Sequence, residues 1–269
     1  MGELDGRVAL VTGAGRGIGA SIAEAIAEQG GHVALIDINL EAAQAVVDGI
    51  DGDKCVAVEL DVSAEEDAIS AGVASIVERL GPIDILVNNA AILDPEVFEG
   101  DVDFAATTKE IWERTFAVNV IGAALMAKHV VPSMMSTGRG GVILNLSSTG
   151  AFKGDVSSVA YRTSKTALEG LTRCMAASHG PYGIRCNAIA PGLILTPAAE
   201  QHSSTEHLAL LGHGRLIKDI GRPRDVAELA IFLVSDRARY LTGASFMIDG
   251  GASILQSWHA LRVHCESSG

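Results

Sequence analysis

A tyrosine and a lysine four residues apart, Tyr161 and Lys165, are the residues of this chain best suited to acid–base chemistry. They fall in a segment of helical pattern, where residues four apart share one face. A tyrosine hydroxyl is a poor base at neutral pH, and lowering its pKa from about 10 to about 7 requires roughly 4 kcal/mol of preference for the phenolate. A neighbouring ammonium group favours the phenolate and so lowers the tyrosine pKa. The spacing also recurs by chance, so an exposed tyrosine beside a solvated lysine is the alternative.

A hydroxyl group is expected beside this pair. The sequence Asn-Leu-Ser-Ser at 145–148 closes the strand predicted just before the helix, so Ser148 follows its carboxyl end. Ligands of open α/β sheets bind beyond the carboxyl ends of the strands. Ser148 is therefore expected at the edge where Tyr161 and Lys165 would act.

A glycine-rich turn, Thr-Gly-Ala-Gly-Arg-Gly-Ile-Gly, occupies residues 12–19 between an apolar strand and a helix. Missing side chains let the backbone approach a pyrophosphate, and the N–H groups and dipole of the helix end attract its charge. Gly13, Gly17, Ile18 and Gly19 are therefore candidate cofactor-binding residues. Ile18 stands where the usual GxGxxG pattern has its third glycine, so a tight turn without a ligand remains an alternative.

Asp37 favours a dinucleotide ligand, and NAD in particular. It ends the second predicted strand, about 20 residues after the turn, where a carboxylate accepts hydrogen bonds from the adenosine ribose hydroxyls. Its charge would repel the 2′-phosphate of NADP. Arg16 in the turn is a contrary signal, because a basic side chain could serve that phosphate; we give Asp37 more weight.

Two further motifs follow predicted strands at the edge where the adenine side of the cofactor would rest. Asp61 and Val62 end the third strand, and the Asn-Asn-Ala sequence at 88–90, with Asn89 and Ala90, ends the fourth. Asn and Asp also favour such positions as ordinary turn residues. Each motif alone therefore leaves ligand binding open.

The elements that would position these residues alternate along the chain. Apolar runs predict strands, and helical periodicity predicts the helices between them. The expected strands are 8–11, 32–36, 55–60, 83–87, 142–146, 184–189 and 245–248. The expected helices run from about Ala20 to Gly30 and over 40–47, 65–79, 107–135, 159–178 and 224–235, with an irregular stretch at 191–220. This order predicts a doubly wound α/β fold, of Rossmann type, with a mainly parallel sheet.

Length and composition indicate a single domain and exclude several classes of function. The chain has 269 residues, 48% of them hydrophobic, and a net charge of −13 that opposes binding to nucleic acid or anionic membranes. We see no apolar run of about 18 residues, as a membrane span requires, and no signal peptide. The four cysteines show no metal-ligand spacing, so we expect reduced thiols in a cytoplasmic protein.

Taken together, the motifs resemble those of the short-chain dehydrogenase/reductase family, in its compact branch of about 250 residues. The resemblance extends from about Arg7 to Gly251, which leaves a short carboxyl-terminal tail. It rests on family motifs that occur here in the family's order: the TGxxxGxG turn, Asn-Asn-Ala at 88–90, Asn119, Ser148, Tyr161 with Lys165, and Pro191-Gly192.

The resemblance implies roles for these residues. Tyr161 would be the acid/base on the substrate oxygen, Ser148 would hydrogen-bond that oxygen, and Lys165 would lower the tyrosine pKa and hold the nicotinamide ribose. Asn119 would hold a water that links Lys165 to solvent. The loop residues Pro191, Gly192, Ile194 and Thr196 would lie against the nicotinamide carboxamide. The family also implies a homotetramer and no metal.

Two features depart from the family pattern. Ala91 stands where Asn-Asn-Ala is usually followed by glycine, which predicts a small local adjustment. Residues 92–109 form a longer and more acidic connection than usual, and we expect it beside the substrate mouth. Its charge would oppose carboxylate or acyl-carrier substrates, which leaves neutral secondary alcohols or ketones.

Two other segments are less informative. His202, His207 and His213 fit no compact metal motif, so we interpret them as solvated loop residues. Trp258, His259 and Arg262 belong to the tail, which could close a partner's site or be frayed.

The sequence therefore predicts an NAD(H)-dependent oxidoreductase acting on a secondary alcohol or ketone. The alternatives are an NADPH-dependent 3-ketoacyl reductase, which Asp37 disfavours, and a non-catalytic dinucleotide-binding sensor. A sensor would not need all of Asn119, Ser148, Tyr161 and Lys165.

Overall fold

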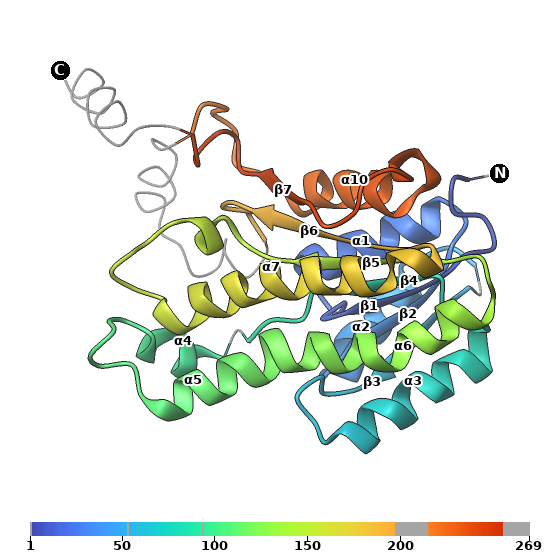
Figure 1. Ribbon diagram of the computed structural model, residues 1–269, viewed down its shortest axis with the longest axis horizontal. Coiled ribbons are helices and arrows are strands. Elements are labelled where there is room, and N and C mark those ends of the chain that lie inside the picture. Colours follow the sequence, from blue (N-terminus) through green and yellow to red (C-terminus); the bar gives the residue numbers. More distant parts are fainter. Residues whose placement is uncertain (1, 53, 93, 197–214, 255–269) are drawn as a thin grey trace.

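A seven-stranded sheet forms the centre of the molecule in the computed structural model, which describes residues 2–52, 54–92, 94–196 and 215–254 (Figure 1). All neighbouring strands are parallel, in the order β3-β2-β1-β4-β5-β6-β7. The strands are β1 (Val8–Thr12), β2 (His32–Asp37), β3 (Cys55–Glu59), β4 (Ile85–Asn88), β5 (Gly141–Leu146), β6 (Ile184–Pro191) and β7 (Ser245–Ile248). The predicted doubly wound α/β fold is confirmed.

The apolar composition of the strands explains this architecture. Strands β1, β4 and β5 are buried along their whole length, as expected where helices cover both faces of a parallel sheet. The register is regular, with Ala9 of β1 opposite Val33 of β2 on one side and Ile85 of β4 on the other.

Helices cover the sheet in two layers (Figure 1). Ile22 and Ile26 of α1 and Val226 of α10 belong to the core on one face, and Ile76 of α3 and Met126 of α6 belong to the core on the other. The longer helices are α1 (Gly17–Glu28), α2 (Leu40–Asp48), α3 (Glu66–Leu80), α5 (Lys109–Phe116), α6 (Ala123–Ser136), α7 (Val159–His179) and α10 (Pro223–Val234).

Several predicted boundaries were wrong by a few residues. Helix α1 begins at Gly17 rather than near Ala20, so it includes the last glycines of the turn. Strand β4 is Ile85–Asn88 rather than 83–87. The helix expected within 107–135 is divided, since a π-helical segment, η1 (Ala117–Gly122), separates α5 from α6.

The acidic connection 92–109 contains a helix that the sequence pattern did not predict, α4 (Pro95–Gly100). Its six residues are too few for a periodic apolar face. Tertiary packing holds it instead: a Cβ added at Gly100 would lie 2.6 Å from the Cδ1 atom of Ile111 on α5.

The continuous helical stretch Lys109–Ser136 is long and apolar enough, by composition, to cross a membrane. The sequence predicts a helix here, but the expectation that no apolar run reaches about 18 residues does not hold for this stretch. Its apolar character has a structural explanation, because Met126, Val130 and Met134 are fully buried in the core beneath the sheet. The thiols of Cys55, Cys174 and Cys186 are free, whereas Cys265 lies outside the described residues.

Candidate active site

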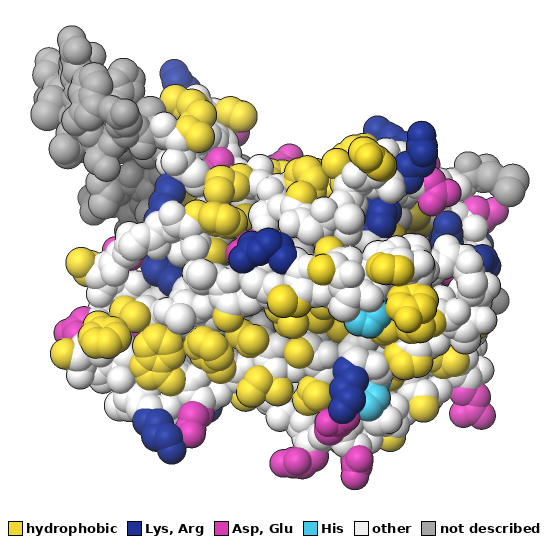
Figure 2. All heavy atoms as spheres, in the orientation of Figure 1, with side chains coloured by type: hydrophobic (Ala, Val, Ile, Leu, Met, Phe, Trp, Pro, Cys, Tyr) yellow, Lys and Arg dark blue, Asp and Glu magenta, His cyan; other side chains and the backbone are white. Residues whose placement is uncertain are grey.

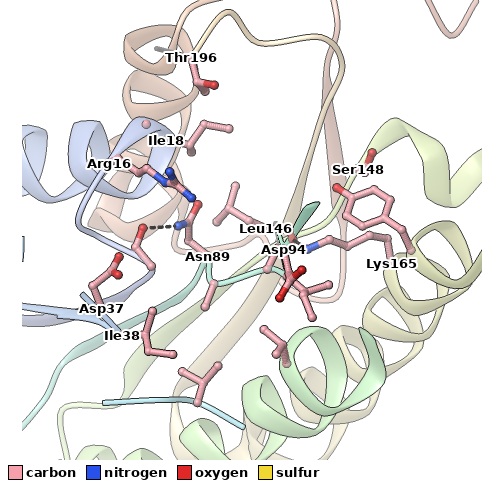
Figure 3. Close-up of a pocket in the computed structure, with 18 of the residues that line it drawn as sticks. Arg16, Ile18, Asp37, Ile38, Asn89, Asp94, Leu146, Ser148, Lys165 and Thr196 are labelled. Carbon is pink, nitrogen blue, oxygen red and sulfur yellow. Dashed lines mark hydrogen bonds between the residues drawn. The ribbon is translucent and has the colours of Figure 1, made fainter. Parts of the chain in front are cut away.

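A cavity of about 990 Å³ lies at the carboxyl ends of the strands, at the point between β1 and β4 where the strand order reverses (Figure 3). This is the position at which doubly wound sheets bind ligands. Its wall includes almost all the residues predicted for the site, which come from loops far apart in the sequence. The predicted residues that line it are Gly13, Arg16, Gly17, Ile18, Asp37, Asp61, Val62, Asn89, Ala90, Ser148, Tyr161, Lys165, Pro191, Gly192, Ile194 and Thr196.

The glycine turn lines one end of the cavity, and its backbone conformation favours glycine at two positions. Gly13 and Gly17 have φ values of +64° and +61°, which favour glycine. A Cβ at Gly13 would lie 2.9 Å from the Cα atom of Ala90, and one at Gly17 would lie 3.4 Å from the Thr196 side chain. The turn therefore leaves its backbone accessible, as a pyrophosphate ligand requires.

Gly19 does not line the cavity, although the sequence suggested that it contacts the cofactor. A Cβ at this position would lie 2.2 Å from the carbonyl oxygen of Gly13. Gly19 therefore allows helix α1 to pack directly under the turn, the task usually assigned to the third glycine of GxGxxG. In this chain Gly19, the residue after Ile18, therefore provides the close packing that the third glycine provides in GxGxxG.

The Asn-Asn-Ala motif holds the glycine turn in place. The Nδ2 atom of Asn89 donates to the carbonyl oxygens of Thr12 (2.9 Å) and Gly13 (3.0 Å), while the Thr12 hydroxyl accepts from the N–H groups of Asn89 and Ala90. Asn88 lies deeper and donates to Asn145 Oδ1 (2.9 Å) in the core. Asn88 and the side-chain amide of Asn89 therefore make contacts within the protein.

Asp37 lines the cavity near the glycine turn. Its carboxylate accepts hydrogen bonds from the N–H groups of Gly15 (2.8 Å) and Asn39 (3.0 Å). The next residue, Ile38, is 68% exposed and also lines the cavity, although sequence reasoning did not select it. Its position directly after the strand-end carboxylate was the available signal, and an apolar side chain there is suited to an adenine ring.

Asp61 and Val62 form the neighbouring wall. Asp61 accepts from the N–H group (2.8 Å) and the hydroxyl (2.7 Å) of Ser63, which is the turn chemistry that the sequence left open as an alternative. Val62 is 6% exposed and packs against Gly122, where a Cβ would lie 2.6 Å from the Val62 carbonyl oxygen. Both residues still line the cavity.

Ser148, Tyr161 and Lys165 also line the cavity, and Figure 3 shows Ser148 and Lys165 on the side away from Arg16 and Asp37. Ser148 hydrogen-bonds the Tyr161 hydroxyl and also accepts from the N–H group of Gly150 (3.0 Å). The Lys165 ammonium donates to the carbonyl oxygen of Leu146 (2.7 Å) and lies 5.7 Å from the centre of the tyrosine ring. The predicted grouping of these three side chains is thus observed.

Burial shifts the pKa values of Tyr161 and Lys165. Burial of the hydroxyl raises the tyrosine pKa above 10, and the hydrogen bond with Ser148 and the charge of Arg162 only partly oppose this effect. Burial also lowers the pKa of Lys165 to about 8, against the charge of Glu169, which raises it. Desolvation therefore exceeds the effect of nearby charge on the Tyr161 pKa, and the lowering by Lys165 stays a prediction.

Asn119 lies behind the cavity, within the π-helical segment η1. Its Oδ1 atom accepts from the N–H group of Ile92 (2.9 Å) and its Nδ2 atom donates to the Ser164 hydroxyl (2.9 Å). Both ends of the amide thus bind protein groups. Short π-helical segments often occur at functional sites, where they alter the ordinary backbone hydrogen bonds of the helix.

The loop after β6 faces the glycine turn. The Gly192 N–H donates to Ile248 (2.9 Å), and a Cβ at Gly192 would lie 2.6 Å from the Cβ of Asp249. Ile194 forms a parallel bridge with Gly221. Thr196 follows this bridge by two residues and lies close to Gly17 in the cavity wall.

The mouth of the cavity contains an ion pair that sequence reasoning missed. The Arg114 guanidinium of α5 donates to the Asp94 carboxylate at 2.6 Å, and both residues line the cavity. The hydrogen bond with Arg114 lowers the pKa of Asp94. Asp94 and Pro95 of the acidic segment thus line the cavity, and Arg114 offsets part of the segment's negative charge.

No group of His, Cys, Asp or Glu able to hold a metal occurs in the described ranges. The loop histidines and the tail residues lie outside those ranges. The residues present fit a dinucleotide, because the positive-φ glycines leave a cradle that a Cβ would fill and a carboxylate lies beside an apolar surface at the far end.

Comparisons with known proteins agree with this geometry. A family model described as enoyl-(acyl carrier protein) reductase matches residues 13–253. The chain is 36% identical to sorbitol dehydrogenase of Cereibacter sphaeroides (93% of this chain, 98% of that protein) and 37% identical to 7alpha-hydroxysteroid dehydrogenase of Escherichia coli K12 (93% and 95%). A crystal structure from Burkholderia xenovorans, described as that of a candidate short-chain dehydrogenase/reductase, superposes with a TM-score of 0.87 at 32% identity and covers 96% of this chain and 100% of that one.

Proposed function

Because the chain belongs to the short-chain dehydrogenase/reductase family, we propose that it is an NAD(H)-dependent enzyme that interconverts a neutral secondary alcohol and its ketone. One observation carries the proposal. The same cavity is lined by the glycine turn with Asp37 at one end and by Ser148, Tyr161 and Lys165 at the other. A bound dinucleotide would extend from the first group to the second.

In the oxidation direction, the Tyr161 phenolate removes the proton of the substrate hydroxyl as the carbon gives up hydride. When bound, NAD supplies the hydride acceptor at its nicotinamide ring. Ser148 donates a hydrogen bond to the substrate oxygen and so holds it near Tyr161. In the reverse direction Tyr161 returns the proton to the carbonyl oxygen.

We assign Lys165 to the nicotinamide ribose and to stabilisation of the tyrosine phenolate. In the structure its ammonium donates to the Leu146 carbonyl, so it lies close to the reacting groups without an acidic partner at hydrogen-bond distance among the described residues. Asn119 acts from behind the cavity. Its side chain is already hydrogen-bonded to Ile92 and Ser164. We therefore propose that its backbone carbonyl oxygen, in the π segment, binds the water that links Lys165 to solvent.

The preference for NAD over NADP rests on Asp37. Its carboxylate would accept from the ribose hydroxyls and repel a 2′-phosphate. Arg16 lines the same part of the cavity and favours the alternative, an NADPH-dependent 3-ketoacyl reductase. Tighter binding of NADPH than of NADH in a fluorescence titration would select that alternative.

The substrate is tested by a panel of secondary alcohols, including polyols and hydroxysteroids, followed through NADH absorbance at 340 nm. The names of the relatives suggest these two classes. Oxidation of one or more members with NAD supports the proposal. Tight NADH binding with no turnover of any alcohol or ketone would favour the non-catalytic sensor.

We also propose a cytoplasmic homotetramer. Figure 2 shows hydrophobic side chains gathered on the face that α5, α6 and α7 present. Met135 of α6 is 39% exposed, and Ile121 of η1, between α5 and α6, is 52% exposed. Association through this face would bury them, and light scattering after size exclusion would give the mass of the assembly.

A further inference from the structure

We propose that Asp101 is a positioning residue for Tyr161, because its buried carboxylate caps helix α7 from outside that helix and fixes the turn that carries the tyrosine. The inference rests on the proposed function. Asp101 belongs to the acidic connection 92–109, which the mechanism above does not use. It is 4% exposed, whereas most acidic residues of this connection are partly or fully exposed.

Asp101 makes most of its hydrogen bonds to the start of α7, and its Oδ1 atom also accepts from the Thr107 hydroxyl (3.3 Å). Its Oδ1 atom accepts from the N–H group of Ala160 (3.0 Å) and its Oδ2 atom accepts from the N–H group of Tyr161 (3.0 Å). Its carbonyl oxygen accepts from the N–H group of Ser158 (2.6 Å). Three N–H groups at the beginning of the catalytic helix therefore bind one residue that is distant in sequence.

Helix α7 lacks an ordinary cap of its own. A capping side chain normally accepts from the second or third N–H group of the helix, but the side chain of Ser158, the residue before α7, makes no such bond. Ser158 has φ = +56°, the only positive φ at a non-glycine residue in the described part of the chain. Such a conformation persists only where surrounding contacts impose it, and the bonds to Asp101 are contacts of that kind.

Asp101 also connects this helix to the mouth of the cavity. Its N–H group donates to the Val97 carbonyl oxygen (3.1 Å), so it ends α4. The first residue of α4, Pro95, and the residue before it, Asp94, line the cavity. Helix α4 is therefore a short link between the substrate mouth and the backbone of Tyr161.

The test compares Asp101→Ala and Asp101→Asn with Asp103→Ala in the full-length enzyme. Asp103 is the matched control, because it also accepts backbone hydrogen bonds, from Ala105 (2.6 Å) and Ala106 (3.3 Å), but has no hydrogen bond to α7. We expect Asp101→Ala to lower kcat by about 10- to 100-fold, the loss that a small displacement of a reacting group produces. The Kd for NADH should change by less than about twofold, since the glycine turn and Asp37 are untouched. Asp101→Asn, which retains one acceptor oxygen, should recover part of kcat, and Asp103→Ala should retain it.

Amide hydrogen exchange gives a readout that does not depend on turnover. Peptides containing Ala160 and Tyr161 should exchange faster in Asp101→Ala than in the wild type, and at the wild-type rate in Asp103→Ala. Unchanged exchange, or unchanged kcat in Asp101→Ala, would overturn the inference, as would an equal loss of kcat in Asp103→Ala. If Asp101→Ala does not fold, kcat and exchange in Asp101→Asn decide in the same way. Absence of turnover in the wild type would instead refute the proposed function, and exchange would still test the cap.

Discussion

Asp37→Asn tests the choice of cofactor with the smallest change in shape. The carboxylate accepts from the N–H groups of Gly15 and Asn39, and the amide oxygen of asparagine can still accept from one of them. The glycine turn should therefore keep its conformation. What the variant loses is the negative charge at the adenosine end of the cavity.

The magnitude follows from two effects of opposite sign. A hydrogen bond to a charged group contributes about 1.5–3 kcal/mol and a neutral one about 0.5–1.5 kcal/mol, so NADH affinity should fall by about 1–2 kcal/mol, or about 5- to 30-fold. A 2′-phosphate with about two negative charges at about 5 Å from the carboxylate is repelled by about 2 kcal/mol even at the dielectric constant of water. Removal of that repulsion should strengthen NADPH binding. Together the effects shift the ratio of the two Kd values by about 100-fold or more.

Fluorescence titration of the wild type and of Asp37→Asn with NADH and NADPH measures this ratio. Asp67→Asn serves as the control, because it removes an exposed carboxylate in the first turn of α3 that does not line the cavity. It should leave the ratio unchanged. A wild type that prefers NADPH, or an Asp37→Asn variant with the wild-type ratio, would refute the reasoning.

Two further predictions concern the glycine turn and the buried lysine. Gly19→Ala should weaken NADH binding and lower the free energy of unfolding by about 1–3 kcal/mol, because its Cβ would lie 2.2 Å from the Gly13 carbonyl oxygen. In the control Gly49→Ala the new Cβ has 3.5 Å of space, so NADH affinity, measured by titration, and stability, measured by thermal melting, should both stay unchanged. Lys165 has a pKa of about 8 when folded and 10.5 when unfolded, so between these values the unfolded chain binds more protons at this residue, which contributes about 3 kcal/mol of stability as pH rises. Burial raises the pKa of Cys186 and so acts in the opposite direction, but this effect is common to the wild type and Lys165→Met and cancels in their difference. Denaturation of Lys165→Met should lack this gain; an equal gain in both proteins would show that Lys165 is not its source.

Much of the fold could be predicted because it depends on local pattern. The strands are continuous apolar runs, and α7, expected at 159–178, extends over Val159–His179. Helix α4 could not be predicted, because six residues carry no period and Gly100 packs on Ile111 only in the folded chain. The π segment was missed for a similar reason. The apolar period of 107–135 fits an uninterrupted α-helix. The hydrogen bonds of the Asn119 side chain with Ile92 and Ser164 join residues that are distant in sequence, and so they are not visible in that period.

The residues that form the candidate site could be predicted more readily than their pKa values and their long-range contacts. Residue types and strand ends identified the glycine turn, Asp37, Ser148, Tyr161 and Lys165, all of which line or form the cavity wall. Burial is not visible in a sequence, so the raised pKa of Tyr161 was not foreseen. Nor was the contact of Asp101 with α7, since the two lie far apart along the chain.

Turnover and NADH affinity of Tyr161→Phe, measured side by side, test the central claim most directly. The substitution removes only the hydroxyl, which hydrogen-bonds Ser148, and leaves the ring beside Lys165. The proposed mechanism predicts a loss of alcohol oxidation and ketone reduction of about 100-fold or more, the contribution of a general acid/base, with the Kd for NADH unchanged within about twofold. Retained turnover in this variant would contradict the account, because some other group would then transfer the proton.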